Sequence, residues 1–126
     1  MAKIEIRTDS APTPVAKFSQ GVRKGNVVQI AGQVAFDATS GDIVGDTVGE
    51  QTRQTMRNLN AVLEAAGASM DDVVMLRVFL TDTAHFGEMN SAYGEFVTEP
   101  YPARTTVYVG LPAGLLVEID ALAVLD

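Results

Sequence analysis

Two charged residues near the C-terminus stand in stretches that are otherwise largely apolar and strand-like. Arg104 lies in the segment 101–109, and Glu118 lies in the segment 115–125. A guanidinium binds a carboxylate through two parallel, charge-assisted hydrogen bonds. A carboxyl group in a partly apolar cleft is suited to general acid–base work. Spacing alone favours a plain interpretation of these two residues, an ion pair or two solvated charges on a wet sheet face.

Both segments have the composition of β-strands, and a turn-forming run of glycine, proline and small residues separates them. Successive side chains of a strand point to opposite faces. Arg104 thus shares a face with Thr106, and Glu118 shares one with Asp120. If the two strands pair as neighbours, we expect Arg104 and Glu118 to project from one sheet surface. The opposite face of the second strand is apolar throughout: Leu115, Val117, Ile119, Ala121, Ala123 and Leu125.

Two amphipathic helices are predicted upstream of these strands. The first begins at Thr47 with the pattern of a capping box, repeats apolar residues in steps of three and four, and ends at Gly67. The second begins after Asp82 and cannot continue to Pro100. Asn90 falls within the apolar stripe of this second helix, so we expect its side chain to be hydrogen-bonded or to lie at an opening.

The remaining strands complete an α+β fold. Residues 18–23 and 26–32 form a predicted hairpin, 72–81 a strand, and 3–7 a short edge-strand pattern. Apart from that edge pattern the order is β-β-α-β-α-β-β. Such an order predicts two helices on one face of a mixed sheet, with strands that flank a helix free to run parallel.

The sheet face away from the helices is expected to be too apolar for water. A monomer would expose a patch larger than soluble monomers usually tolerate, so we expect other copies of the chain to cover it, with small-molecule sites in the clefts where subunits meet. Arg77 is expected on the same face, in an ion pair with Glu118 or Asp120. The apolar residues assigned to this face are Met75, Phe79, Tyr108, Leu116, Leu122 and Val124.

The composition is that of one globular domain spanning residues 1–126, with 47% apolar and 20% charged residues. The net charge is −7 and no Lys/Arg cluster is longer than Arg23-Lys24, which argues against a nucleic-acid partner. No apolar run approaches the ~20 residues that cross a bilayer, and no signal peptide is recognisable. We therefore expect no membrane partner and a cytoplasmic location. With no cysteine and a single histidine, no zinc site and no other cofactor is expected.

The chain resembles the RidA/YjgF family of reactive-intermediate imine and enamine deaminases over nearly its whole length. The most specific signal is Pro102-Ala103-Arg104, followed some fourteen residues later by Glu118 in an apolar strand. The resemblance implies a chorismate-mutase-like fold and a homotrimer with a barrel-like core and active sites at the subunit interfaces. Some members are described as ribonucleases, an activity that the acidic balance of this chain disfavours. Further matching segments are Ser19-Gln20-Gly21-Val22, Ala31-Gly32-Gln33, residues 51–67, Asn90, Tyr93 and Val117-Glu118-Ile119-Asp120-Ala121.

The same resemblance implies a role for each of four residues. Arg104 would bind the substrate carboxylate, and Glu118 would position or activate the water that attacks the imine carbon. Asn90 would line the pocket, and Gly32 would let the backbone approach the ligand. The reaction implied is hydrolytic deamination of 2-imino or enamino acids, of the 2-aminoacrylate type, to 2-oxo acids and ammonia.

Three positions depart from the family pattern. Phe18 stands where many members carry an aromatic hydroxyl, Ala31 where they carry a serine, and Thr106 where they often carry a cysteine. The first two changes remove side-chain hydrogen-bond donors and make the pocket more apolar. They leave an alternative open, in which the chain is a non-catalytic trimeric binder of small carboxylated metabolites that serves as a sensor or regulatory protein.

Overall fold

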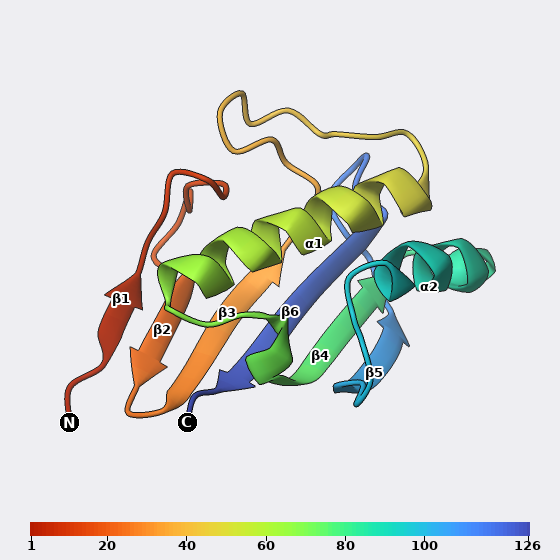
Figure 1. Cartoon of the computed structure of the whole chain (residues 1–126). Helices are drawn as coiled ribbons and strands as arrows, with labels where there is room; N and C mark the ends of the chain where they lie inside the picture. Colours follow the sequence, from red (N-terminus) through yellow and green to blue (C-terminus); the bar gives the residue numbers. More distant parts are fainter.

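Alternating apolar residues build one mixed sheet with two helices on one face, and the computed structural model describes residues 1–126 (Figure 1). The sheet is six-stranded with the order β1-β2-β3-β6-β4-β5. Only β4 and β5 pair in parallel; all other neighbours are antiparallel. The expected α+β class is confirmed, and the edge-strand pattern at the N-terminus does pair, as β1. The strands are β1 (Ile4–Ile6), β2 (Gly21–Lys24), β3 (Val27–Gln33), β4 (Val73–Leu80), β5 (Ala103–Tyr108) and β6 (Val117–Val124).

Helix α1 (Val48–Ala65) begins and ends where its capping residues predict. The Thr47 hydroxyl accepts a hydrogen bond from the Glu50 amide at 3.2 Å, and Gly67 follows the helix with φ +75°. The Glu50 carboxylate does not reach back to the Thr47 amide as a full capping box requires. It accepts from the Thr47 hydroxyl instead, at 2.9 Å, so the predicted box is only half formed.

Helix α2 (Phe86–Gly94) is preceded by a 3₁₀ turn, η2 (Thr83–His85), in which the Ala84 amide donates to the Asp82 carboxylate at 2.8 Å. The Glu88 carboxylate of α2 accepts a 2.7 Å hydrogen bond from the Gly49 amide in the first turn of α1. A carboxylate at a helix N-terminus satisfies a free amide and is stabilised by the helix dipole. This contact fixes α2 against α1 and so helps to place the side chains that α2 turns toward β5. Neither helix has the length and apolar composition needed to cross a bilayer.

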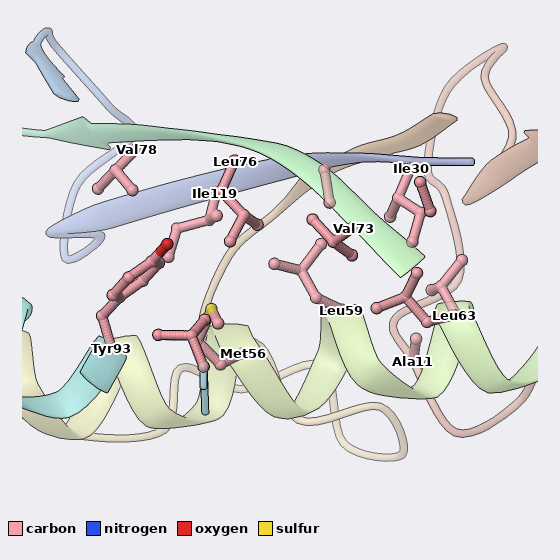
Figure 2. Close-up of a cluster of buried hydrophobic side chains, with 14 of the residues drawn as sticks. Ala11, Ile30, Met56, Leu59, Leu63, Val73, Leu76, Val78, Tyr93 and Ile119 are labelled. Atoms are coloured by element: carbon pink, nitrogen blue, oxygen red, sulfur yellow. The ribbon is translucent and has the colours of Figure 1, made fainter. Parts of the chain in front are cut away.

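The hydrophobic core lies between the helices and the sheet. Figure 2 shows Met56, Leu59 and Leu63 of α1 pointing toward Ile30 and Ile119 of the sheet. These five side chains are less than 2% exposed. Because the core fills one side only, the opposite face of the sheet is open in the single chain.

The strand order corrects one expectation about the two charged residues. The strands that carry Arg104 and Glu118 are not neighbours, because β4 lies between β5 and β6. Arg104 pairs with the buried Leu76 and so lies on the helix face, whereas Glu118 pairs with Phe79 and lies on the open face. The prediction of a shared sheet surface is therefore wrong. The cause is the crossover through α2, which places β5 parallel to β4 at the sheet edge, while β6 inserts antiparallel between β3 and β4.

The open face keeps most of its expected apolar residues but loses two. Tyr108 pairs with Leu80 and lies on the helix face, and Leu116 packs against the core. For Tyr108 the reason is that alternation does not fix the orientation of one strand relative to another. Leu116 precedes β6, where strand alternation does not apply. The residues that remain on the open face, by their pairing, are Met75, Phe79, Leu122 and Val124.

A buried glutamine ties α1 to the loop that precedes β6. Gln51 is 1% exposed. Its amide nitrogen donates to the Gly114 carbonyl at 2.8 Å and to the Gly45 carbonyl at 3.2 Å, and its oxygen accepts from the Leu116 amide at 2.9 Å. One side chain thus satisfies three backbone groups that strands and helices leave unpaired.

Replacing Gln51 by leucine should lower the free energy of unfolding by about 2–4 kcal/mol, because buried backbone groups would lose their only side-chain partner. Denaturant unfolding at a fixed protein concentration measures the effect. Gln54→Leu is the matched control: Gln54 bonds only the Asn58 side chain, and its loss should lower stability by less than about 1 kcal/mol. Equal unfolding midpoints for the two variants would contradict this role of Gln51.

Candidate active site

Helix α2 holds the Arg104 side chain from one side. The guanidinium donates from Nη1 to Asn90 Oδ1 at 2.7 Å. Its central carbon lies 4.8 Å from the centre of the Tyr93 ring and 5.5 Å from that of Phe86, both within cation–π range. The expectation that Asn90 is hydrogen-bonded or lies at an opening is confirmed. Phe86, Asn90 and Tyr93 lie on one stripe of α2, so a single helix face presents two aromatic rings and an amide to the arginine.

The charge of Arg104 is not balanced by any carboxylate of its own chain. The ion pairs in the structure are Arg53–Glu95 and Arg77–Asp120. A guanidinium has five N–H donors, and only one hydrogen bond is made to the protein. The orientation of the Arg104 guanidinium is thus fixed, and its remaining N–H groups are free to bind an anion. Burial raises the pKa of Tyr93, and the nearby Arg104 charge acts in the opposite direction.

A pocket of about 530 Å³ opens beside Arg104. Polar groups occupy one part of its wall and aromatic and aliphatic groups the rest, which suits a small organic carboxylate. Thr106 follows two positions along β5 and faces the same side as Arg104 by the strand register. The lining residues are Asn90, Tyr93, Gly94, Val97, Tyr101, Pro102 and Arg104.

Glu118 occupies a different environment on the open face of the sheet. It is half-buried, and its carboxyl group makes no hydrogen bond or ion pair within the chain. Burial raises the pKa of Glu118, and the negative charge of Asp120 raises it further. A carboxyl group in this state exchanges a proton more readily near neutral pH than a solvated one does.

Gly32 makes room for the Glu118 carboxyl. It lies in an irregularity of the β3–β6 pairing, where the register shifts between Ile30 and Gln33. A β-carbon added at Gly32 would lie 2.5 Å from Oε2 of Glu118. The absent side chain therefore defines the space that the carboxyl group occupies. Ala31 lies in the same irregularity, and its amide donates to the Gln20 carbonyl at 2.9 Å.

The structure divides the predicted site residues into separate groups. Arg104, Asn90 and Thr106 belong to the helix face near the β5 edge, and Glu118 and Gly32 belong to the open face. Phe18 lies apart from both.

Phe18 is half exposed and lines a small pocket with residues of the N-terminal segment. The sequence does not predict the contact of Phe86 and Tyr93 with the guanidinium, because aromatic residues in an apolar helix stripe usually pack into the core. Their spacing of four and three residues around Asn90 is the signal that could have indicated it.

Arg77 and Asp120 form a bidentate ion pair on the open face. Arg77 donates from Nε to Oδ1 at 3.0 Å and from Nη2 to Oδ2 at 2.6 Å. The predicted ion pair of Arg77 is confirmed, with Asp120 as its partner. Half of the Arg77 side chain remains exposed in the single chain, with a relative exposure of 55%.

Comparison with known proteins places this geometry in a family. A family model described as endoribonuclease L-PSP matches residues 8–125. A RutC family protein of Pyrococcus abyssi is 43% identical over 98% of both chains. The mouse 2-iminobutanoate/2-iminopropanoate deaminase is 38% identical over 94% of this chain and 89% of its own. The crystal structure of RidA from an Antarctic Psychrobacter is 40% identical and superposes with a TM-score of 0.92, over 97% of this chain and 99% of that one.

The fold and the match over nearly the whole chain define a protein of the endoribonuclease L-PSP type, a family that includes proteins named as imine deaminases. The chain belongs to the RidA/YjgF family, as the sequence resemblance indicated.

Proposed function

We propose that the protein hydrolyses reactive 2-imino and enamino acids to 2-oxo acids and ammonia. The observation that carries the proposal is the Arg104 guanidinium, which is held in place by α2 and has no carboxylate partner of its own. Such a group is prepared for a carboxylated ligand. The deaminase name of the mouse relative supports the reaction type.

The reaction needs one water molecule and one group that accepts and returns a proton. Arg104 binds the carboxylate of the imino acid. Glu118 takes a proton from water as the oxygen adds to the carbon of the protonated imine, whose C=N electron pair moves to nitrogen and leaves an amine. Glu118 then gives this proton to the amine nitrogen. As the C–N bond of the carbinolamine breaks, Glu118 accepts the hydroxyl proton, ammonia leaves, a 2-oxo acid remains, and Glu118 releases its proton to solvent. The raised pKa of Glu118 suits it to these transfers.

A second copy of the chain must complete this site. Arg104 and Glu118 lie on opposite faces of the sheet in one chain, so the two groups of one chain do not face the same substrate. Arg104 lies on the edge strand β5, from which it can meet the open face of a neighbour. We therefore propose a homotrimer with interfacial sites, in which the apolar residues Met75, Phe79, Leu122 and Val124 of the open face are covered.

The experiment generates imines in solution with an amino-acid oxidase and follows their loss above the spontaneous rate. We expect acceleration by the wild-type protein without added metal or cofactor, and sedimentation at the mass of a trimer. A protein that binds 2-oxo acids but accelerates the loss of none of the imines would instead be a metabolite binder. The absence of side-chain donors at Phe18 and Ala31 is the observation that favours this second function. A stable folded monomer with full activity would contradict the interfacial site.

Gly32→Ala should lower turnover by roughly 10- to 100-fold, because the added methyl group displaces the Glu118 carboxyl by about an ångström. Folding should be little affected, since the displaced atoms are the end of a flexible side chain. Initial rates and thermal unfolding test both statements. Gly87→Ala is the control, because a β-carbon there meets nothing within 4 Å. Wild-type turnover in Gly32→Ala would show that the position of Glu118 is not limiting.

A further inference from the structure

Three charged side chains lie close together on the open face of the sheet. The β4–β6 register pairs Arg77 with Asp120 and the adjacent Phe79 with Glu118. Arg77 and Glu118 are thus diagonal neighbours across two strands, at a separation that long side chains can span. Yet Arg77 places both of its hydrogen bonds on Asp120, at 3.0 and 2.6 Å. Glu118, next along the same face, makes none.

We propose that Asp120 is a positioning residue for Glu118: by binding Arg77 at two points, it keeps the guanidinium from pairing with the carboxyl group that handles the proton. The inference rests on the proposed function, because it assigns Glu118 that task. An Arg77–Glu118 ion pair would hold Glu118 ionised and turned toward β4, and so would remove it from the substrate. The bidentate geometry prevents this, since a planar guanidinium that spans both oxygens of one carboxylate has little left to offer another.

The burial of Asp120 strengthens the assignment. Asp120 is 8% exposed as a residue, and a carboxylate at that depth needs a charged partner. Arg77 is the cation on its face of β4, so the pair is held together by the need to compensate Asp120. Glu118 is more exposed and can do without a partner. The two carboxyl groups therefore do not compete equally for Arg77.

No other charged group of the chain faces Glu118. Strand β3, on the other side of β6, carries no charged residue, and β5 turns Thr105 and Val107 to this face. Arg104 points to the helix face and can reach Glu118 only from a second copy. The protonation of Glu118 within the chain thus depends on its burial, on Asp120, which also raises its pKa, and on where Arg77 is held.

The test measures the titration of the Glu118 carboxyl carbon by NMR, with the signal assigned by its loss in Glu118→Gln. Asp120→Asn removes a negative charge and frees Arg77, so the midpoint should move to lower pH. Arg77→Met leaves Asp120 without its cation, so the midpoint should move to higher pH. The double variant combines Asp120→Asn with Arg77→Met, so no freed guanidinium is present. Its midpoint pH should therefore fall by less than that of Asp120→Asn. Equal falls in Asp120→Asn and the double variant, or no fall in either, would overturn the proposal.

A second ion pair of the same geometry supplies the control. Arg53 of α1 donates from Nε to Oε1 of Glu95 at 3.1 Å and from Nη2 to Oε2 at 2.8 Å; Glu95 directly follows α2, on the other side of the sheet. Glu95→Gln should therefore change neither the Glu118 titration nor turnover. If Asp120→Asn does not fold, Arg77→Met still decides, because an unchanged midpoint there contradicts the proposal.

The outcome is separable from that of the proposed function. The titration needs no turnover. An inactive wild-type protein would refute the deaminase, and the predicted order of midpoints in that protein would keep the positioning role. In an active protein, the acid limb of the kcat/KM profile should move to lower pH in Asp120→Asn. An active Asp120→Asn with an unmoved acid limb would refute the positioning role alone. A purely structural role of Asp120 would lower thermal stability, and the Glu118 midpoint would then fall equally in Asp120→Asn and in the double variant.

Discussion

Arg104→Ala should lose both turnover and the binding of 2-oxo acids. The variant would remove the proposed bidentate, partly desolvated contact to the substrate carboxylate, worth on the order of 2–5 kcal/mol. This corresponds to roughly a 30-fold to several-thousand-fold fall in kcat/KM. Arg104→Lys keeps the charge but lacks the planar fork and its stacking against Tyr93 and Phe86, so it should recover only part of the loss.

Two measurements decide this result. Initial rates on imines generated in solution report turnover, and calorimetric titration with a stable 2-oxo acid reports binding. Arg57→Ala is the matched control, because Arg57 is exposed on α1 and forms no ion pair. Unchanged affinity for 2-oxo acids in Arg104→Ala would remove Arg104 from the binding site, and with it the main support for the proposed function.

The local structure around Arg104 is largely predictable from sequence, because it depends on short-range rules. The caps at Thr47 and Gly67 set the ends of α1, and apolar periodicity sets the buried faces of α1 and β6. The amide of Asn90 within an apolar stripe pointed to a hydrogen bond, which the structure shows to be with Arg104. Each of these inferences needs only residues a few positions apart.

The relation between Arg104 and Glu118 could not be predicted in the same way. Alternation assigns faces within a strand, but not which strands are neighbours or which face of one strand matches which face of another. The insertion of β6 between β3 and β4 is decided by the packing of the whole sheet. This insertion puts Arg104 and Glu118 on opposite faces of the sheet, whereas the sequence predicted that both would lie on one face.

The contacts between distant segments could not be predicted from the sequence either. Gln51 bonds Gly114, and Glu88 bonds Gly49. Glutamine and glutamate on helices are most often solvated, so composition gives no reason to place either in such a role. Both contacts fix the loops and helices around the Arg104 pocket, and their importance follows only from the three-dimensional arrangement.

Glu118→Gln should separate binding from chemistry. The variant keeps the size of the side chain but cannot take a proton from water, so turnover should fall by about 10²–10⁴-fold. Affinity for a stable 2-oxo acid should remain, because Arg104 is intact. Glu64→Gln on the exposed face of α1 is the control and should match the wild type in both assays. Loss of binding together with turnover would assign Glu118 to ligand binding and not to proton transfer.

The same variant should also change how stability depends on pH. The pKa of Glu118 is raised in the folded protein by burial and by Asp120, whereas in the unfolded chain it is near the ordinary value of about 4.3. The folded state therefore holds the proton more tightly, and wild-type stability falls as pH rises from the unfolded pKa through the folded one. Glutamine does not titrate, so Glu118→Gln should gain stability over the wild type as pH rises to 7–8. Denaturant unfolding at several pH values measures this difference, and a difference independent of pH would mean that the folded protein does not perturb the Glu118 carboxyl.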